Sequence, residues 1–134
     1  MEMRDLAQVF ALHPEVDVLA KEISRKCKKH FLLTNLYASA KNIILHAIHN
    51  RLITNQKSAT LLVILDNADD AQYTYADLRT LNSNQGVYFF PSSHRRRQQT
   101  DEPMPVQRTE VLTTLHNATP RRTTPIIVTY PEAL

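Results

Sequence analysis

One nine-residue stretch, which follows an apolar run at residues 31–33, decides how the fold is interpreted: Thr34-Asn35-Leu36-Tyr37-Ala38-Ser39-Ala40-Lys41-Asn42. A helical pattern begins at its end, and a phosphate-binding P-loop occupies that kind of turn between a strand and a helix. The P-loop template is glycine, four residues, then glycine, lysine and serine or threonine. Here Asn35 and Ala40 stand at the glycines, Lys41 at the lysine and Asn42 at the hydroxyl, so only the lysine fits.

The three replacements indicate a nucleotide pocket that has kept its outline and lost its chemistry. Glycine serves a P-loop because the loop needs positive φ and close approach of backbone N–H groups to phosphate, and a Cβ at Ala40 obstructs both. The template's hydroxyl binds magnesium, for which the neutral amide of Asn42 is a much poorer ligand. An alternative explanation is that an ordinary helix N-cap at Ser39 resembles the motif by accident.

Length and composition narrow the class of protein. The 134 residues suffice for one domain with a sizeable core. The formal net charge of +3 permits a nucleic-acid partner without requiring one. We expect a cytoplasmic protein, because the chain has no transmembrane run, no apolar signal segment at its start and a lone cysteine, Cys27, that has no internal disulfide partner. A single glycine excludes any mechanism that needs a glycine-rich loop.

Helical and strand patterns alternate along the chain. Helices are expected at residues 1–12, 14–29, 39–54, 67–78 and 106–117, and strands at 31–33, 60–65, 86–90 and 126–129. The aliphatic run at 60–65 is typical of a strand that is buried on both faces. This order predicts an α/β fold of three layers, a parallel sheet with helices on both faces. We divide the chain into an N-terminal helical segment, 1–29, and an α/β domain, 30–134, that looks truncated at its C-terminus.

Several side chains invite a catalytic or metal-binding reading that the sequence does not support. His46 and His49 stand three residues apart, but no third ligand accompanies them at motif spacing, so we expect no metal site. Asp66 closes an apolar run as a Walker B aspartate does, yet Asp66 or Asn67 is also placed to cap the next helix. Nothing brings Ser39, His94 and Asp66 together as a hydrolase triad. We therefore expect no catalytic residues.

The best candidates for anion or DNA contact are Arg95, Arg96 and Arg97. They follow the strand predicted at 86–90, and open α/β sheets bind ligands at the carboxyl ends of their strands. A solvated surface loop is the alternative reading of this run.

The order of these segments resembles the UvrB-like N-terminal region (domain 1A) of bacterial transcription-repair coupling factors (Mfd). The likeness spans roughly residues 30–134 and is fairly specific in the order and spacing of its parts. The segments that carry it are residues 35–42, 62–67, 71–78, 87–93, 108–112 and 127–134.

The resemblance implies a RecA-like P-loop NTPase fold in a degenerate and partial form, and a domain without catalysis of its own. UvrB-like proteins that use ATP keep an intact P-loop, whereas the UvrB-like module of coupling factors has a disabled nucleotide site, so Asn35, Ala40 and Asn42 favour the coupling factor. It also implies that Asp66 is not a Walker B residue. We thus expect no cofactor for this chain, with ATP and magnesium used by motor domains of a parent DNA translocase.

The resemblance also implies partners: other domains of the parent, UvrA through the adjacent domain, RNA polymerase and DNA through the parent, and no membrane. Two other hypotheses stay open. One is an active UvrB-type P-loop ATPase, with Lys41 at the phosphates and Asp66 at the metal. The other is a free-standing DNA-binding module built on the Arg95–Arg97 run with Arg121 and Arg122.

Overall fold

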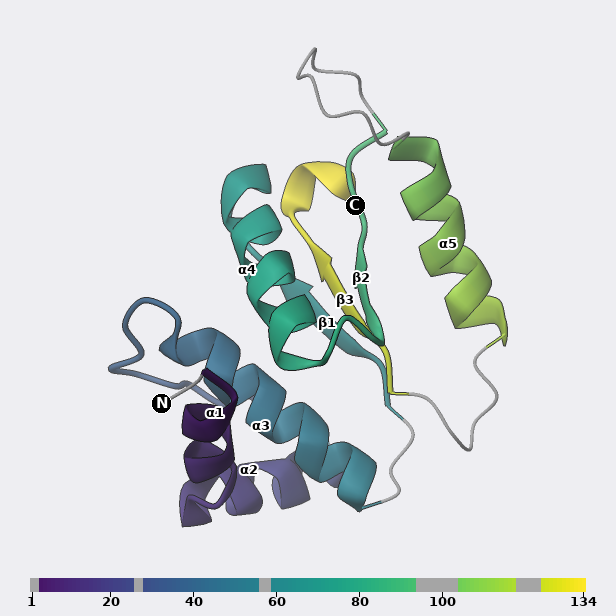
Figure 1. The fold of residues 1–134 in the computed structure, drawn as a ribbon. Coiled ribbons are helices and arrows are strands. Elements are labelled where there is room, and N and C mark those ends of the chain that lie inside the picture. Colours follow the sequence, from purple (N-terminus) through teal and green to yellow (C-terminus); the bar gives the residue numbers. More distant parts are fainter. Residues whose placement is uncertain (1–2, 26–27, 56–58, 94–103, 118–123) are drawn as a thin grey trace.

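The computed structural model describes residues 3–25, 28–55, 59–93, 104–117 and 124–134, which form an α/β fold around a small parallel sheet (Figure 1). The elements are, in order, α1 (Met3–Ala11), α2 (Pro14–Ser24), α3 (Ala40–Thr54), β1 (Leu61–Ile64), α4 (Ala68–Leu81), β2 (Val87–Phe89), α5 (Met104–Asn117), β3 (Ile126–Thr129) and a 3-10 helix, η1 (Pro131–Ala133).

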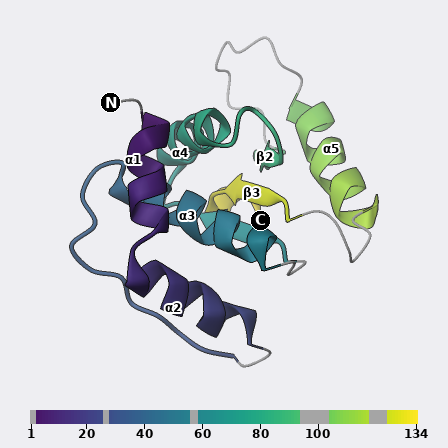
Figure 2. The same ribbon diagram turned by 60° about the horizontal axis from the view of Figure 1, so that its bottom comes forward.

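The sheet has three parallel strands in the order β1-β3-β2. Val128 in the central strand stands opposite Val63 on one side and Phe89 on the other. The chain passes from β1 beyond β3 to β2 and then returns to β3, so right-handed crossovers place their helices on opposite faces of the sheet. Figures 1 and 2 show α4 and α5 in this arrangement. The predicted parallel sheet with helices on both faces is therefore present.

The main core lies between the sheet and α4. Ala71 and Leu78 of α4 pack against Val63, Phe89 and Val128, and all five side chains are buried. The start of α4 is fixed by Asn67, whose Oδ1 accepts a hydrogen bond from the Asp70 backbone N–H at 2.9 Å. Of the two residues placed to cap this helix, Asn67 is the one that does so.

Helix α3 is enclosed on several sides, as Figure 2 shows. Ile48 and Leu52 pack against Val16 of α2, and Ile43 packs against α1 and α4. Leu45 packs against the main core, between the sheet and α4. A helix that is buried nearly all round loses the single apolar stripe of a surface helix. This explains why the structure buries Asn42, His46 and His49, which were not expected in the core.

The strand expected at residues 31–33 is not formed, and that prediction was wrong. Phe31, Leu32 and Leu33 are 45%, 88% and 50% exposed and run without regular structure. Three residues form few ladder hydrogen bonds, and within the described part of the chain no strand lies beside them. The described sheet therefore has three strands rather than four, and the loop at 34–39 follows irregular chain instead of a strand.

Two further expectations need correction or stay open. The run at 60–65 was expected to be buried on both faces, but Leu62 and Ile64 of β1 are 52% and 51% exposed. The reason is that β1 lies at an edge of the sheet and α5 packs on β2.

Helices α1 and α2 both contact α3, and the domain boundary expected at residue 29 stays a prediction. No helix in the described ranges is long and apolar enough to cross a membrane.

Candidate functional site: the N-terminus of α3

The turn that leads into α3 holds two residues with positive φ, neither of them glycine. Asn35, at the first glycine of the template, has φ 61°, and Ala38 has φ 48°. Asparagine tolerates this left-handed region better than most residues, whereas Ala38 holds it at a cost of about 1 kcal/mol. Ala40, at the second glycine, is the first residue of α3 and has no positive φ. The methyl group of Ala40 is thus accommodated by an ordinary start of a helix.

Backbone amides at this turn already have partners within the chain. The N–H groups of Ala40 and Asn42 donate to the carbonyl oxygens of Tyr37 and Ser39, each at 3.0 Å. In a P-loop such amides point at phosphate oxygens. Ser39 stands at the N-cap position, but its side chain makes no capping hydrogen bond. The accidental N-cap that was the alternative reading is therefore not formed through its hydroxyl.

The carboxylate of Asp77, a residue of α4, contacts the first residues of α3. Asn42, which is only 3% exposed, donates from Nδ2 to Oδ2 of Asp77 at 2.7 Å. The Ser39 hydroxyl lies 3.4 Å from the same oxygen. Both partners belong to the first turn of α3, so Asp77 ties the start of α3 to the middle of α4. The sequence pattern did not identify Asp77, because it lies 35 residues from Asn42 along the chain.

The position of Asp77 decides what this helix terminus can bind. The N-terminus of a helix carries a partial positive charge that attracts anions. Here that charge already faces the Asp77 carboxylate, and a phosphate brought to within about 4 Å of it would meet a repulsion of about 1 kcal/mol per unit charge in water and about 4 kcal/mol near a protein surface. Lys41 is exposed, and no ion pair joins it to any described residue. The arrangement favours a closed helix start over a phosphate cradle.

The two histidines of α3 are buried and neutral rather than ready for a metal. Nε2 of His49 lies 2.6 Å from the carbonyl oxygen of Thr124, so this nitrogen carries the proton. Nε2 of His46 lies 3.0 Å from Asn50 Nδ2 and accepts from it. Burial lowers the pKa of both imidazoles, partly opposed by the Asn82 side chain. No group of three metal-binding side chains occurs among the residues that the structure describes.

The carboxyl ends of the strands hold a different basic residue from the expected ones. Arg95, Arg96 and Arg97 lie outside the described residues, as do His94, Cys27, Arg121 and Arg122. Arg108 of α5 instead reaches the carboxyl ends of the strands. Its Nη1 donates to the carbonyl oxygens of Pro91 at 2.7 Å and Ala133 at 3.1 Å, and its guanidinium lies 4.1 Å from the centre of the Phe90 ring. Arg108 therefore links the segment after β2 to the segment after β3.

Asp66 lies at the same end of the sheet, two residues after β1, and is exposed. It does not take the cap position of α4, which Asn67 fills. The Tyr130 hydroxyl accepts a hydrogen bond from the Ser92 N–H at 2.8 Å, so the carboxyl ends of the strands are stabilised by contacts within the chain.

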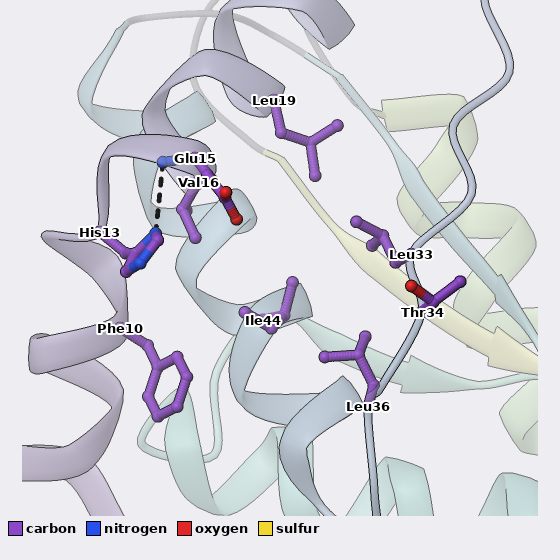
Figure 3. Close-up of a pocket in the computed structure, with 9 residues that line it drawn as sticks. All are labelled: Phe10, His13, Glu15, Val16, Leu19, Leu33, Thr34, Leu36 and Ile44. Carbon is purple, nitrogen blue, oxygen red and sulfur yellow. Dashed lines mark hydrogen bonds between the residues drawn. The ribbon is translucent and has the colours of Figure 1, made fainter.

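An apolar hollow of about 240 Å³ lies beside the turn, between α1, α2, α3 and the segment 33–36 (Figure 3). Leu33 and Leu36 from that segment face Phe10, Val16 and Ile44 from the three helices. At its rim, Nδ1 of His13 accepts the Glu15 N–H at 3.3 Å and so caps α2. The hollow offers few polar groups to orient a nucleotide, and of the apolar residues at 31–33 only Leu33 lines it.

Comparisons with protein families, with curated proteins and with solved structures found no match to this chain.

Proposed function

We propose that this chain is a non-catalytic, UvrB-like N-terminal domain of a transcription-repair coupling factor. In such a parent protein, motor domains hydrolyse ATP and translocate on DNA, while the UvrB-like module recruits the UvrA-containing excision machinery to stalled RNA polymerase. The chain would support that module, and UvrA would bind the adjacent domain. This proposal rests on the sequence resemblance together with the α/β class of the fold.

The single observation that carries the non-catalytic part is the closed start of α3. The Asp77 carboxylate is held there by Asn42, and the amides of Ala40 and Asn42 are bonded to carbonyl oxygens. A nucleotide would have to displace the carboxylate and break these bonds before its phosphates met the helix. Such a site suits a domain that keeps the shape of a nucleotide fold for structural reasons.

The segments that carry the resemblance coincide with the framework of the sheet. Residues 62–67 run from β1 to the cap of α4, residues 71–78 lie within α4, and residues 127–134 comprise most of β3 and all of η1. These are the parts that build the main core. The likeness therefore concerns the scaffold as well as the disabled turn.

Nucleotide titration tests the non-catalytic part directly. Calorimetry with ATP and magnesium should give no binding tighter than about 100 μM, which corresponds to about −5.5 kcal/mol. Tighter binding that is lost when Lys41→Ala is introduced would favour the working-ATPase hypothesis instead. Lys21→Ala, a lysine of α2 that pairs with Asp17, is the matched control.

The recruiting role is tested on the full natural gene product. It should contain motor motifs, and it should retain UvrA in a pull-down at physiological salt. Absence of both would reject the coupling-factor proposal. Duplex binding by the 134-residue chain that weakens steeply with salt would favour the DNA-binding module instead.

A further inference from the structure

The apolar hollow beside α3 lies where two groups of packed side chains remain separate. Val16 of α2 packs against the middle of α3, and Leu19 lies with it. Phe10 of α1 packs instead against the group that contains Ile43, near the start of α3. The segment 33–36 borders the space between the helices from a further side (Figure 3). The helices therefore form a recess that apolar side chains line without filling.

The size of the hollow fits a small organic molecule. An engineered cavity of about 150 Å³ inside a protein holds a benzene ring, whereas this hollow has about 240 Å³. The additional volume suits a ring with a side chain of two or three atoms. Water between apolar walls finds few hydrogen-bond partners, so an apolar molecule that displaces it gains binding free energy. The hollow thus favours an apolar body with about eight to ten non-hydrogen atoms in the whole ligand.

A carboxylate without a cationic partner lies at the rim. Glu15, in the first turn of α2, lines the hollow, and Figure 3 shows its carboxylate on the side of the open space. No ion pair joins Glu15 to any residue that the structure describes. The N-terminus of α2 contributes about half a positive charge, which offsets the carboxylate only in part. His13 beside it is neutral, because its Nδ1 accepts the Glu15 N–H. The rim therefore keeps a net negative charge.

We propose that this hollow binds a small organic cation, an apolar ring or short alkyl group that carries a primary ammonium. The apolar body occupies the space between Leu33, Leu36 and Ile44. The ammonium has three donors, and it faces the Glu15 carboxylate and the hydroxyl of Thr34, which also lines the hollow. Pockets with mostly apolar walls and a few polar groups are typical of small-molecule sites. This binding goes beyond the proposed function and does not depend on it.

An NMR titration of the 134-residue chain tests the site. The test compound is phenethylammonium, and phenethyl alcohol, which has the same ring and chain without the charge, is its matched control. The methyl signals of Leu33, Leu36 and Ile44 should shift in a saturable manner, with a dissociation constant for the ammonium below about 1 mM. The ammonium should bind about threefold more tightly than the alcohol, as expected for one ion pair at a surface. Methylammonium, which lacks the apolar body, should leave the three residues unshifted.

A charge-removing variant tests the role of Glu15. Glu15→Gln should abolish the preference for the ammonium and leave the affinity for the alcohol unchanged. Asp69→Asn, which changes an exposed carboxylate in the first turn of α4, is the matched control and should retain the preference.

A space-filling variant tests the location of the site. Leu33→Trp should weaken the binding of both compounds at least about tenfold, because the larger side chain fills part of the hollow. Leu33 is 50% exposed and lies outside regular structure, so the chain should still fold. Leu32→Trp is the matched control, since Leu32 is 88% exposed and does not line the hollow, and it should bind as the unchanged chain does.

The proposal is overturned if no saturable shifts appear, or if phenethyl alcohol or hydrocinnamate, the corresponding carboxylate, binds as tightly as phenethylammonium. Binding that Leu33→Trp leaves unchanged would place the ligand elsewhere and would also overturn it. Methyl signals that move with protein concentration alone would show that a second copy of the chain fills the hollow, which rejects a small-molecule site. The coupling-factor proposal fails by different results, the absence of motor motifs and of UvrA capture.

Discussion

Removing the Asp77 carboxylate should detach the start of α3 from α4. Asn42 is almost fully buried, and its Nδ2 donates only to Asp77 among the described partners, at 2.7 Å. A hydrogen bond to a charged group contributes about 1.5 to 3 kcal/mol, and a carboxylate near a helix N-terminus adds about 0.3 to 1 kcal/mol. Because Asp77 is only partly buried, we take the lower part of these ranges. We expect Asp77→Ala to lower the free energy of unfolding by about 2 kcal/mol.

Urea unfolding followed by circular dichroism at 222 nm measures this change. Asp77→Asn keeps an acceptor for Asn42 and should lose about half as much. Asp66→Ala, an exposed aspartate at the end of β1, is the control and should shift stability by less than about 0.5 kcal/mol. In a double-mutant cycle with Asn42→Ala, the two changes should couple by at least about 1 kcal/mol. Equal effects of the Asp77 and Asp66 variants, with no coupling, would refute the reasoning.

Three further outcomes are expected. The free energy of unfolding should fall as pH drops below about 6.5, because the pKa of His46 and of His49 is lowered in the folded state and the unfolded state takes up protons first. Its slope should not exceed about 1.4 kcal/mol per pH unit for each histidine. Urea melts at about pH 5 to 7 measure this slope, and His49→Gln should reduce it. The variant that restores the P-loop template, Asn35→Gly, Ala40→Gly and Asn42→Thr together, should show no ATP turnover in a phosphate-release assay, and turnover would mean that the chain holds catalytic groups that we have not recognised. Asn67→Ala should cost about 1 kcal/mol in the same urea assay, because the cap of α4 is lost; an unchanged midpoint would mean that the hydrogen bond from the Asp70 N–H to Asn67 does not stabilise the helix.

The alternation of helices and strands could be read from the sequence because it depends on local patterns. The strand expected at 126–129 coincides with β3, and Asn67 was one of two residues expected to cap α4. These signals lie within a few residues of each other, where spacing and capping preferences act directly. The helix at 39–54 was likewise placed within one residue of its start.

What the sequence did not reveal depends on contacts between distant segments. A strand at 31–33 was inferred from three apolar residues, but the structure packs Leu33 beside α1, α2 and α3 instead of into the sheet. The partner of Asn42 was equally hidden, since an aspartate on α4 has no local signature that links it to the start of α3. The departures of residues 35–42 from the P-loop template could be read from the sequence, while the contacts that Asn42 and Ser39 make with Asp77 required the fold.

The enclosure of α3 has a practical consequence for anyone who shortens this chain. Ala47, Ile48 and Leu52 are shielded from water by side chains of α1 and α2, which come from the first 24 residues. A protein trimmed to begin at residue 30 would expose this apolar face of α3, and exposed apolar patches of this kind promote aggregation. Helices α1 and α2 therefore act as a cover for α3, and a shortened protein that is meant to stay in solution should retain both of them.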